Sequence, residues 1–217
     1  MNKRALISVL LLSGLVGGAA VAGTKSTDSA AAQKAKHGHN SQYGQYGHED
    51  SSDEAKIKRG FEIAPVYLDL KGKNRALVGL GSYIVNAQAG CNDCHTWPNF
   101  APNGDPYLGQ PKMINAGNYL AGGRPFGPFF VSRNITPDPN STMTREERYQ
   151  EFVSIMRTGL DPDGLHPQFG PLLQVMPWSV YQDMTDRDLR AIFEYLSAIP
   201  HAEPYCTPTN PDPLCKP

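Results

Sequence analysis

The sequence predicts a mostly α-helical domain that has few helices and long loops. Three segments between residues 75 and 200 combine helix caps or stops with apolar residues at helical spacing. No segment shows a useful length of the apolar and polar alternation that a half-buried strand requires. The segments between the helices are rich in proline and glycine, which favours ordered loops over further secondary structure.

The first predicted helix spans residues 75–88. Gly90 lies just beyond it, where a glycine often ends a helix. The apolar face of this helix repeats at helical spacing and consists of Leu77, Leu80, Ile84 and Ala87.

Residues 97–139 form a long loop region. Neither helix nor strand periodicity continues through its prolines, glycines, polar and aromatic residues. A stretch of this length without secondary structure inside a compact domain is usually functional. We therefore expect this loop region to wrap around a large bound group.

The second predicted helix begins after Thr144 and stops at Gly159. Thr144 and Glu147 have the spacing of a capping box, and the apolar face that follows contains Tyr149, Phe152 and Met156.

The third predicted helix is capped by Thr185 with Asp188, and Pro200 is expected to end it. Its apolar face consists of Leu189, Ile192, Phe193 and Leu196.

An export signal is predicted at residues 1–22. Lys3 and Arg4 precede an uncharged apolar stretch that ends in AVA at 20–22, the small-x-small pattern after which signal peptidase cuts. An uncleaved membrane anchor is the alternative, since the apolar stretch just reaches spanning length. We therefore expect an exported, periplasmic protein that contacts a membrane only through a partner or an uncleaved signal.

Residues 23–55 are predicted to be a disordered linker, because they contain almost no aliphatic side chains to offset the entropy of ordering. Residues 56–74 are interpreted as a short N-terminal arm, extended up to Pro65, that precedes the main domain at 75–200. The chain has a formal net charge of -1, and such a near-balanced chain gives no electrostatic reason to expect nucleic acid as a partner.

Two of the four cysteines, Cys206 and Cys215, lie in a proline-rich tail at 201–217. Export permits disulfides, and the tail has no core-forming pattern of its own. We expect these two cysteines to form a disulfide, which would close a small loop and stabilise the tail locally.

The other two cysteines belong to the pentapeptide Cys91-Asn92-Asp93-Cys94-His95. Two thiols at this spacing can each add to one vinyl group of a haem while the adjacent imidazole reaches the iron. A zinc site would need two more ligands at a suitable spacing, and a thioredoxin-like dithiol would need a βαβ context. The sequence offers neither, so we expect one covalent haem c held by Cys91 and Cys94, with His95 as the proximal iron ligand.

The second axial ligand is expected to be Met176. Pro177 disfavours helix at Met176 and fixes the direction of the chain ahead of the last helix, so the segment can hold a weak sulfur ligand rigidly. His166 and an open iron site are the alternatives. The other candidate side chains are Met113, Met143, Met156, Met184 and His201.

The sequence resembles the monohaem class I cytochromes c, and most of all the haem modules in cytochrome subunits of bacterial membrane-bound alcohol and gluconate dehydrogenases. The resemblance implies the cytochrome c fold, in which few helices and long loops surround one haem. It also implies that Met176 is the sixth ligand, and that Gly81 lets the first helix closely approach the helix carrying Tyr195. The matching blocks are GSYIVNAQAGCNDCHT at 81–96, GGRPFGPFFVSRNITPD at 122–138, EFVSIMRTG at 151–159, MPW at 176–178 and DRDLRAIFEYLSAIP at 186–200.

With both axial positions filled, neither oxygen nor peroxide could bind the iron without displacing a ligand. We therefore expect a periplasmic single-electron carrier rather than an enzyme, passing electrons between redox protein partners such as a dehydrogenase, an oxidase or another cytochrome. One alternative is a cytochrome subunit fixed in a dehydrogenase or oxidase complex through the arm at 56–74. The other is a haem peroxidase or gas sensor with an open distal site.

Overall fold

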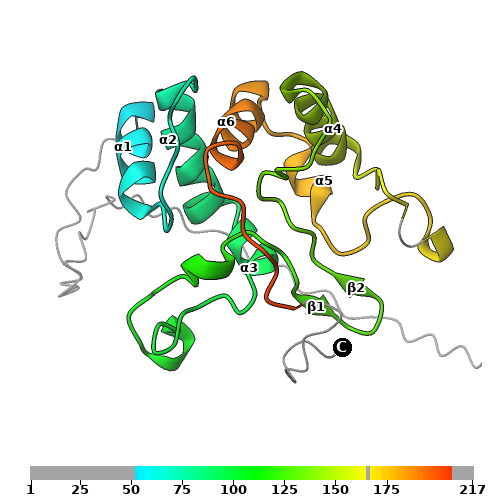
Figure 1. Cartoon of the computed structure of the whole chain (residues 1–217), viewed down its shortest axis with the longest axis horizontal. Helices are drawn as coiled ribbons and strands as arrows, with labels where there is room; N and C mark the ends of the chain where they lie inside the picture. Colours follow the sequence, from blue (N-terminus) through cyan, green and yellow to red (C-terminus); the bar gives the residue numbers. More distant parts are fainter. Residues whose placement is uncertain (1–51, 165–166, 207–217) are drawn as a thin grey trace, which may run out of the picture. The chain divides into compact units, whose positions relative to one another are not determined.

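The computed structural model describes residues 52–164 and 167–206, and in these ranges the fold is mostly α, as predicted (Figure 1). The predicted signal peptide, most of the predicted linker, His166 and Cys215 lie outside the described residues. The elements, in chain order, are α1 (Asp53–Ile63), α2 (Arg75–Tyr83), the π-helical turn η1 (Ile84–Gln88), α3 (Cys91–His95), the 3₁₀ turns η2 (Pro106–Leu108) and η3 (Ala116–Asn118), β1 (Pro125–Phe126), β2 (Phe130–Val131), α4 (Arg145–Thr158), the 3₁₀ turn η4 (Pro167–Phe169), α5 (Trp178–Tyr181) and α6 (Asp186–Leu196).

α2 packs against α1 on one side and α6 on the other, and glycines let the backbones touch (Figure 1). A Cβ atom on Gly60 of α1 would lie 1.9 Å from the carbonyl oxygen of Gly79. A Cβ atom on Gly81 would lie 1.9 Å from the carbonyl oxygen of Ala191 and 2.8 Å from the Cβ of Tyr195. The close approach of Gly81 to the last helix is thereby confirmed.

The end of α2 differs from the prediction because the helix widens into the π-helical turn η1. There the backbone N–H of Ala89 donates to the carbonyl oxygen of Ile84 at 2.7 Å, five residues earlier. The extra residue in the turn rotates the residues that follow, so Ala87 is exposed although it was predicted to be on the apolar face. The buried core of these helices includes Val78, Leu80, Val85, Leu189, Ile192 and Tyr195.

α4 begins and ends as predicted. The side chain of Thr144 accepts a hydrogen bond from the backbone N–H of Glu147, and the Glu147 carboxylate accepts one from the N–H of Thr144. Gly159 ends the helix with φ of 68°, in the left-handed region.

α6 begins as predicted but ends before Pro200. Thr185 accepts from the N–H of Asp188 at 3.1 Å. The last helical residue is Leu196, because Ser197 caps the helix and its hydroxyl donates to the carbonyl oxygen of Phe193 at 2.8 Å.

The prediction of an extended arm before Pro65 is wrong, because this part of the chain forms the helix α1, which begins at Asp53, inside the range predicted as linker. Asp53 pairs with Arg187 of α6. Ile57 and Phe61 pack against the core, so the apolar face of α1 is used within the chain. Among the described residues, no helix combines the length and apolar character needed to cross a bilayer.

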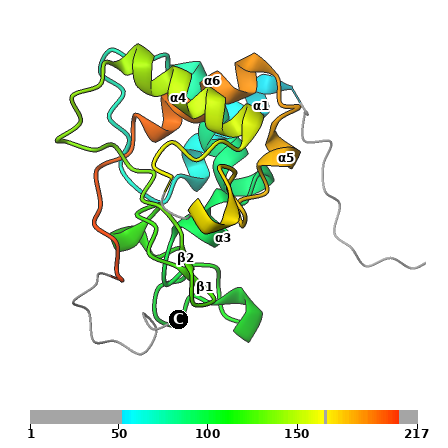
Figure 2. The same cartoon turned by 90° about the vertical axis from the view of Figure 1, so that its right-hand side faces the viewer.

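The loop region at 97–139 stays largely irregular, as predicted, apart from short 3₁₀ turns and a hairpin. The hairpin pairs β1 with β2 in antiparallel register, with Phe126 opposite Phe130. α4 packs beside α6, and the two views place the hairpin away from both of these helices (Figure 2).

Candidate haem site

The short helix α3 consists of the CNDCH pentapeptide. Residues three and four positions apart share one face of a helix, so the side chains of Cys91, Cys94 and His95 point the same way. All three line a cavity of about 700 Å³, and Met176 lines the same cavity from the segment before α5. The structure therefore brings together at one cavity all four residues that the sequence predicts as haem ligands.

The walls of this cavity are mainly apolar and come from distant parts of the chain. α4 contributes Phe152 and Met156, and α6 contributes Ile192, Phe193 and Leu196. Most of the remaining lining comes from the segments 126–138, 161–163 and 170–177. Cavities of roughly 300–1,000 Å³ with apolar linings and a few convergent polar groups hold organic ligands and cofactors. The size and the donor set, two thiols, an imidazole and a thioether, fit a haem c.

The hydrogen bond of His95 fixes which of its ring nitrogens is free. Its Nδ1 lies 2.8 Å from the carbonyl oxygen of Arg133. A carbonyl oxygen only accepts, so Nδ1 carries the proton and Nε2 has an available lone pair. Burial lowers the pKa of His95, against the opposing effect of the Arg133 carbonyl, and the neutral imidazole is therefore favoured. A neutral imidazole with an oriented Nδ1–H is the form that binds a metal ion.

Gly122 is what allows the backbone of Arg133 to reach this position. Its φ is +74°, and a Cβ atom there would lie 2.4 Å from the carbonyl carbon of Arg133. The N–H of Gly122 also donates to the carbonyl oxygen of His95 at 2.7 Å. A side chain at position 122 would therefore displace the carbonyl group of Arg133, which accepts the hydrogen bond from His95.

The side chain of Arg133 is fixed by two carboxylates. It pairs with Asp161 and, at 2.7 Å, with Asp163, both from the segment that follows α4. Arg133 therefore ties the His95 side of the cavity to the segment that leads toward Met176. The sequence prediction missed this role, although Arg133 lies inside the resembling block at 122–138.

Burial favours the protonated form of the two thiols of α3. It raises the pKa of Cys91 to about 12 and also raises the pKa of Cys94. A raised thiol pKa lowers the thiolate fraction on which a redox-active dithiol depends, so these surroundings disfavour the thioredoxin-like interpretation of the motif. Within 52–164 and 167–206, no group of three or more His, Cys, Asp or Glu side chains is placed to hold a metal ion.

The segment that carries Met176 is anchored at two points. The indole of Trp178 packs on Gly159, where a Cβ atom would lie 2.3 Å from the ring, and its Nε1 donates to the carbonyl oxygen of Leu173 at 3.2 Å. The hydroxyl of Tyr181 donates to the carbonyl oxygen of Ala89 at 3.0 Å. The stiffness predicted from Pro177 is therefore reinforced by contacts with α4 and with the residues before α3.

Two other methionines also line the cavity. Met156 lies on α4 and is only 4% exposed, whereas Met143, just before the cap of α4, is 39% exposed. Met113 is exposed and is not part of the cavity lining, and Met184 packs against the core. The test of the sixth ligand must therefore compare Met176 with Met143 and Met156.

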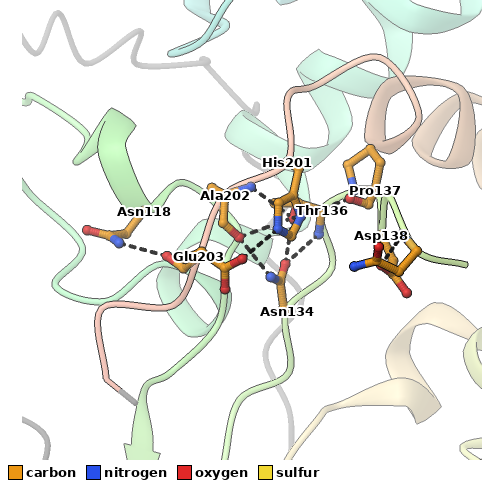
Figure 3. Close-up of polar contacts among 9 residues, drawn as sticks. Asn118, Asn134, Thr136, Pro137, Asp138, His201, Ala202 and Glu203 are labelled. Carbon is orange, nitrogen blue, oxygen red and sulfur yellow. Dashed lines mark hydrogen bonds and ion pairs between the residues drawn. The ribbon is translucent and has the colours of Figure 1, made fainter. Parts of the chain in front are cut away.

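The wall at 134–138 is held from outside by the residues that follow α6 (Figure 3). His201 Nδ1 lies 2.9 Å from the carbonyl oxygen of Pro137, and the amide of Asn134 donates to the carbonyl oxygen of Ala202 at 2.8 Å. The other imidazole nitrogen of His201 lies 2.9 Å from a carboxylate oxygen of Glu203. His201, Ala202 and Glu203 thus form a clamp on the wall at 134–138, and His201 itself does not line the cavity.

The predicted disulfide of the tail involves Cys206, which is described, and Cys215, which lies outside the described residues. The pairing of these two cysteines stays a prediction.

Comparisons with known proteins agree with the resemblance seen in the sequence. The chain is 30% identical over 122 residues to the gluconate 2-dehydrogenase cytochrome c subunit of Pantoea cypripedii, which is 56% of this chain and 23% of the relative. It is 28% identical over 130 residues to the cytochrome c subunit of the alcohol dehydrogenase (quinone) of Komagataeibacter europaeus, which is 58% of this chain and 25% of the relative.

A third relative is the cytochrome c subunit of the alcohol dehydrogenase (quinone) of Gluconobacter oxydans, with 27% identity over 122 residues, 56% of this chain and 21% of the relative. The matched part of the chain spans about a quarter of the length of these curated relatives. No family model matches the chain, and no solved structure matches it. The similarity to cytochrome c subunits of alcohol and gluconate dehydrogenases is confirmed.

Proposed function

We propose that this protein binds one haem c covalently through Cys91 and Cys94, ligates its iron with His95 and Met176, and carries single electrons. The observation that carries this proposal is the convergence of these four side chains on one mainly apolar cavity. Similarity to cytochrome c subunits supports it independently. Around the haem, we expect the chain to adopt the cytochrome c fold.

In this proposal the haem supplies a one-electron Fe(III)/Fe(II) couple, and each residue of the site has a defined task. Cys91 and Cys94 attach the macrocycle by thioether bonds. His95 presents Nε2 to the iron, while Arg133 holds its ring through Nδ1. The apolar walls exclude water and disfavour the additional positive charge of the oxidised iron, as thioether ligation by Met176 also does. The potential should therefore lie above that of bis-histidine haems.

The redox partner in this proposal is another redox protein, such as a dehydrogenase. Because the relatives are subunits of dehydrogenases, a module fixed in such a complex is the second candidate function. The apolar face of α1 already packs on α2, so a fixed partner could not dock on that face. Copurification at low and high salt distinguishes a fixed subunit from a free carrier. A transient partner should dissociate at high salt, whereas a fixed subunit should stay bound to its complex.

Covalent attachment is tested by denaturing gel electrophoresis followed by haem staining. The stain should remain on the polypeptide of the exported wild-type protein. It should be lost when Cys91 and Cys94 are both replaced by Ala, because no thioether bond can then form. Cys206→Ala is the matched control, since it removes a cysteine outside the motif and should leave the stain. Loss of the stain from denatured wild-type protein would contradict the proposal.

The export signal at 1–22 places the protein in the periplasm in this proposal. The mass of the mature protein provides the test. Cleavage after residue 22 predicts a chain that begins at Gly23, whereas a retained segment at 1–22 would support the membrane anchor.

A further inference from the structure

Two arginines line the cavity, and they differ in how their charge is balanced. Arg133 is paired with Asp161 and Asp163. The side chain of Arg148, on α4, makes no hydrogen bond or ion pair with any described residue, and its Nε is buried without a partner. The cavity therefore has one arginine whose charge the surrounding chain leaves unbalanced.

The position of Arg148 indicates that the partner of its charge lies in the cavity. It lies one turn before Phe152 and two turns before Met156, on the face of α4 that lines the cavity. Burying part of a guanidinium without an acceptor is unfavourable, because the group loses water and gains no hydrogen bond. Such a group is expected to find its partner in whatever occupies the cavity.

Two carboxylates of the chain line the cavity and are not held by Arg133. Glu151 is one turn from Arg148 on α4 and also lines the cavity. Among the described residues, no ion pair joins the side chains of Glu151 and Arg148. Asp138 accepts a hydrogen bond from the N–H of Asn140 at 2.8 Å, in the loop before α4. Neither of them balances the charge of Arg148.

We propose that Arg148 binds a carboxylate of the cofactor, namely a propionate group of the haem. This inference rests on the proposed function, and it adds the anchor for the anionic edge of the macrocycle. Haem carries its propionates on the edge away from the vinyl groups, which Cys91 and Cys94 would take. Guanidinium and carboxylate form two parallel, charge-assisted hydrogen bonds, so this pair would fix the cofactor's orientation as well as offset the charge.

The pair should influence the iron through its charge. A guanidinium near the haem disfavours the oxidised iron, and it keeps the propionate ionised by lowering its pKa. Without Arg148, the potential should fall. The propionate should then also take up a proton on reduction, so the potential should vary with pH over roughly pH 5 to 8, where a partly buried carboxyl without a cation titrates.

The test measures the midpoint potential against pH for haem-loaded wild type, Arg148→Gln, Arg148→Lys and Arg145→Gln. Arg148→Gln should lower the potential and steepen its pH dependence, and Arg148→Lys, which keeps the charge, should lie between it and the wild type. Arg145, one turn earlier on α4, is the matched control. Its Nε is also buried without a partner, but its guanidinium pairs with Glu194 and it does not line the cavity. Its substitution should leave the pH profile unchanged.

A haem-loaded Arg148→Gln protein with the wild-type potential and pH profile would overturn this inference alone. If Arg148→Gln does not accumulate, Arg148→Lys decides, because a lysine forms no bidentate pair and should still shift the infrared bands of the propionate. Unshifted bands in that variant would also overturn the inference. A wild-type protein without covalent haem would instead overturn the proposed function.

Discussion

The block of helices α1, α2 and α6 buries its apolar side chains, whereas the walls of the cavity leave several of theirs exposed. In the helical block, side chains such as Val78 and Leu189 are completely buried, and glycines bring the backbones into contact. Around the cavity, Val131, Leu172 and Val175 stay 59%, 39% and 40% exposed although they are apolar. The first region covers its own apolar surface, whereas the second presents its apolar surface to the cavity.

This difference indicates what each region depends on. The helical block is stabilised by its own packing, so changes of volume at its contacts should affect the free energy of unfolding directly. The cavity walls are held by polar anchors at Arg133, Trp178 and His201, and the haem would cover their apolar side chains. Changes there should affect the cofactor as much as the stability.

The largest effect is expected at the contact of α2 with α6. In Gly81→Ala the new methyl group would meet the carbonyl oxygen of Ala191 at 1.9 Å, and neither backbone can move without disturbing the core. We expect a loss of at least about 3 kcal/mol in the free energy of unfolding, measured by denaturant titration. Gly117→Ala is the control, because its Cβ would have only one neighbour, the Asn115 side chain at 3.6 Å. Equal stability of the two variants would mean that α2 and α6 do not touch at Gly81.

Met156 belongs to both regions, because it lies in the core and also lines the cavity. Met156→Ala should lower the free energy of unfolding by about 2–4 kcal/mol, since the side chain is almost fully buried. Met143→Ala should cost less, because Met143 is 39% exposed and so buries less apolar surface than Met156. Neither substitution should change the axial ligands, so the haem spectrum should stay that of the wild type. A changed spectrum in either variant would assign that methionine to the iron.

The helices α2, α4 and α6 could be predicted, as could the four residues that meet at the cavity, because their signals are local. The capping box at Thr144, the N-cap at Thr185, the stop at Gly159 and the spacing of CNDCH each act within a few residues. The π-helical turn at Ile84 had no pattern in the sequence that indicated it. The end of α6 at Ser197 was missed because Pro200 was expected to end the helix, although the hydroxyl of Ser197 bonds locally to the carbonyl oxygen of Phe193.

The role of Arg133 was missed because its partners, His95, Asp161 and Asp163, are far away in the sequence. The proposed role of Arg148 was missed because its proposed partner is not part of the chain.

Arg133 links the two sides of the cavity, and its two carboxylate partners allow a graded test. The Asp161 side chain is 8% exposed and that of Asp163 is 58% exposed. Asp161→Asn should therefore lower the free energy of unfolding by about 1–3 kcal/mol, because the Arg133 guanidinium loses its more buried partner. It should also shift the midpoint potential, because the carbonyl group of Arg133 then orients His95 less firmly. Asp163→Asn should have a smaller effect on both. The reverse order would show that the exposed pair holds Arg133.

The smallest effect is expected at the clamp of His201, where it should appear as a dependence on pH. The hydrogen bond with Glu203 is the main cause that raises the pKa of His201, and the carbonyl of Pro137 and the charge of Asp138 act in the same direction. A raised pKa in the folded state contributes stability that is complete below the unfolded value of about 6.5 and is lost as pH rises through the folded value.

The residues that follow α6 should therefore hold the cavity wall less firmly at about pH 8 than at about pH 6. An NMR titration of the His201 ring should give a lower pKa in Glu203→Gln than in the wild type. An unchanged pKa would exclude Glu203 as the partner of His201 in solution.

The most direct test of the proposed ligation by Met176 is the optical spectrum of the oxidised protein. Ferric haem with a methionine ligand has a weak far-red absorption band, and the wild type should show it. The band should be lost in Met176→Ala, which should also bind carbon monoxide in the reduced state, and it should persist in Met143→Ala and Met156→Ala. A wild-type protein that lacks the band and binds carbon monoxide readily would contradict the electron carrier and favour a haem peroxidase or gas sensor.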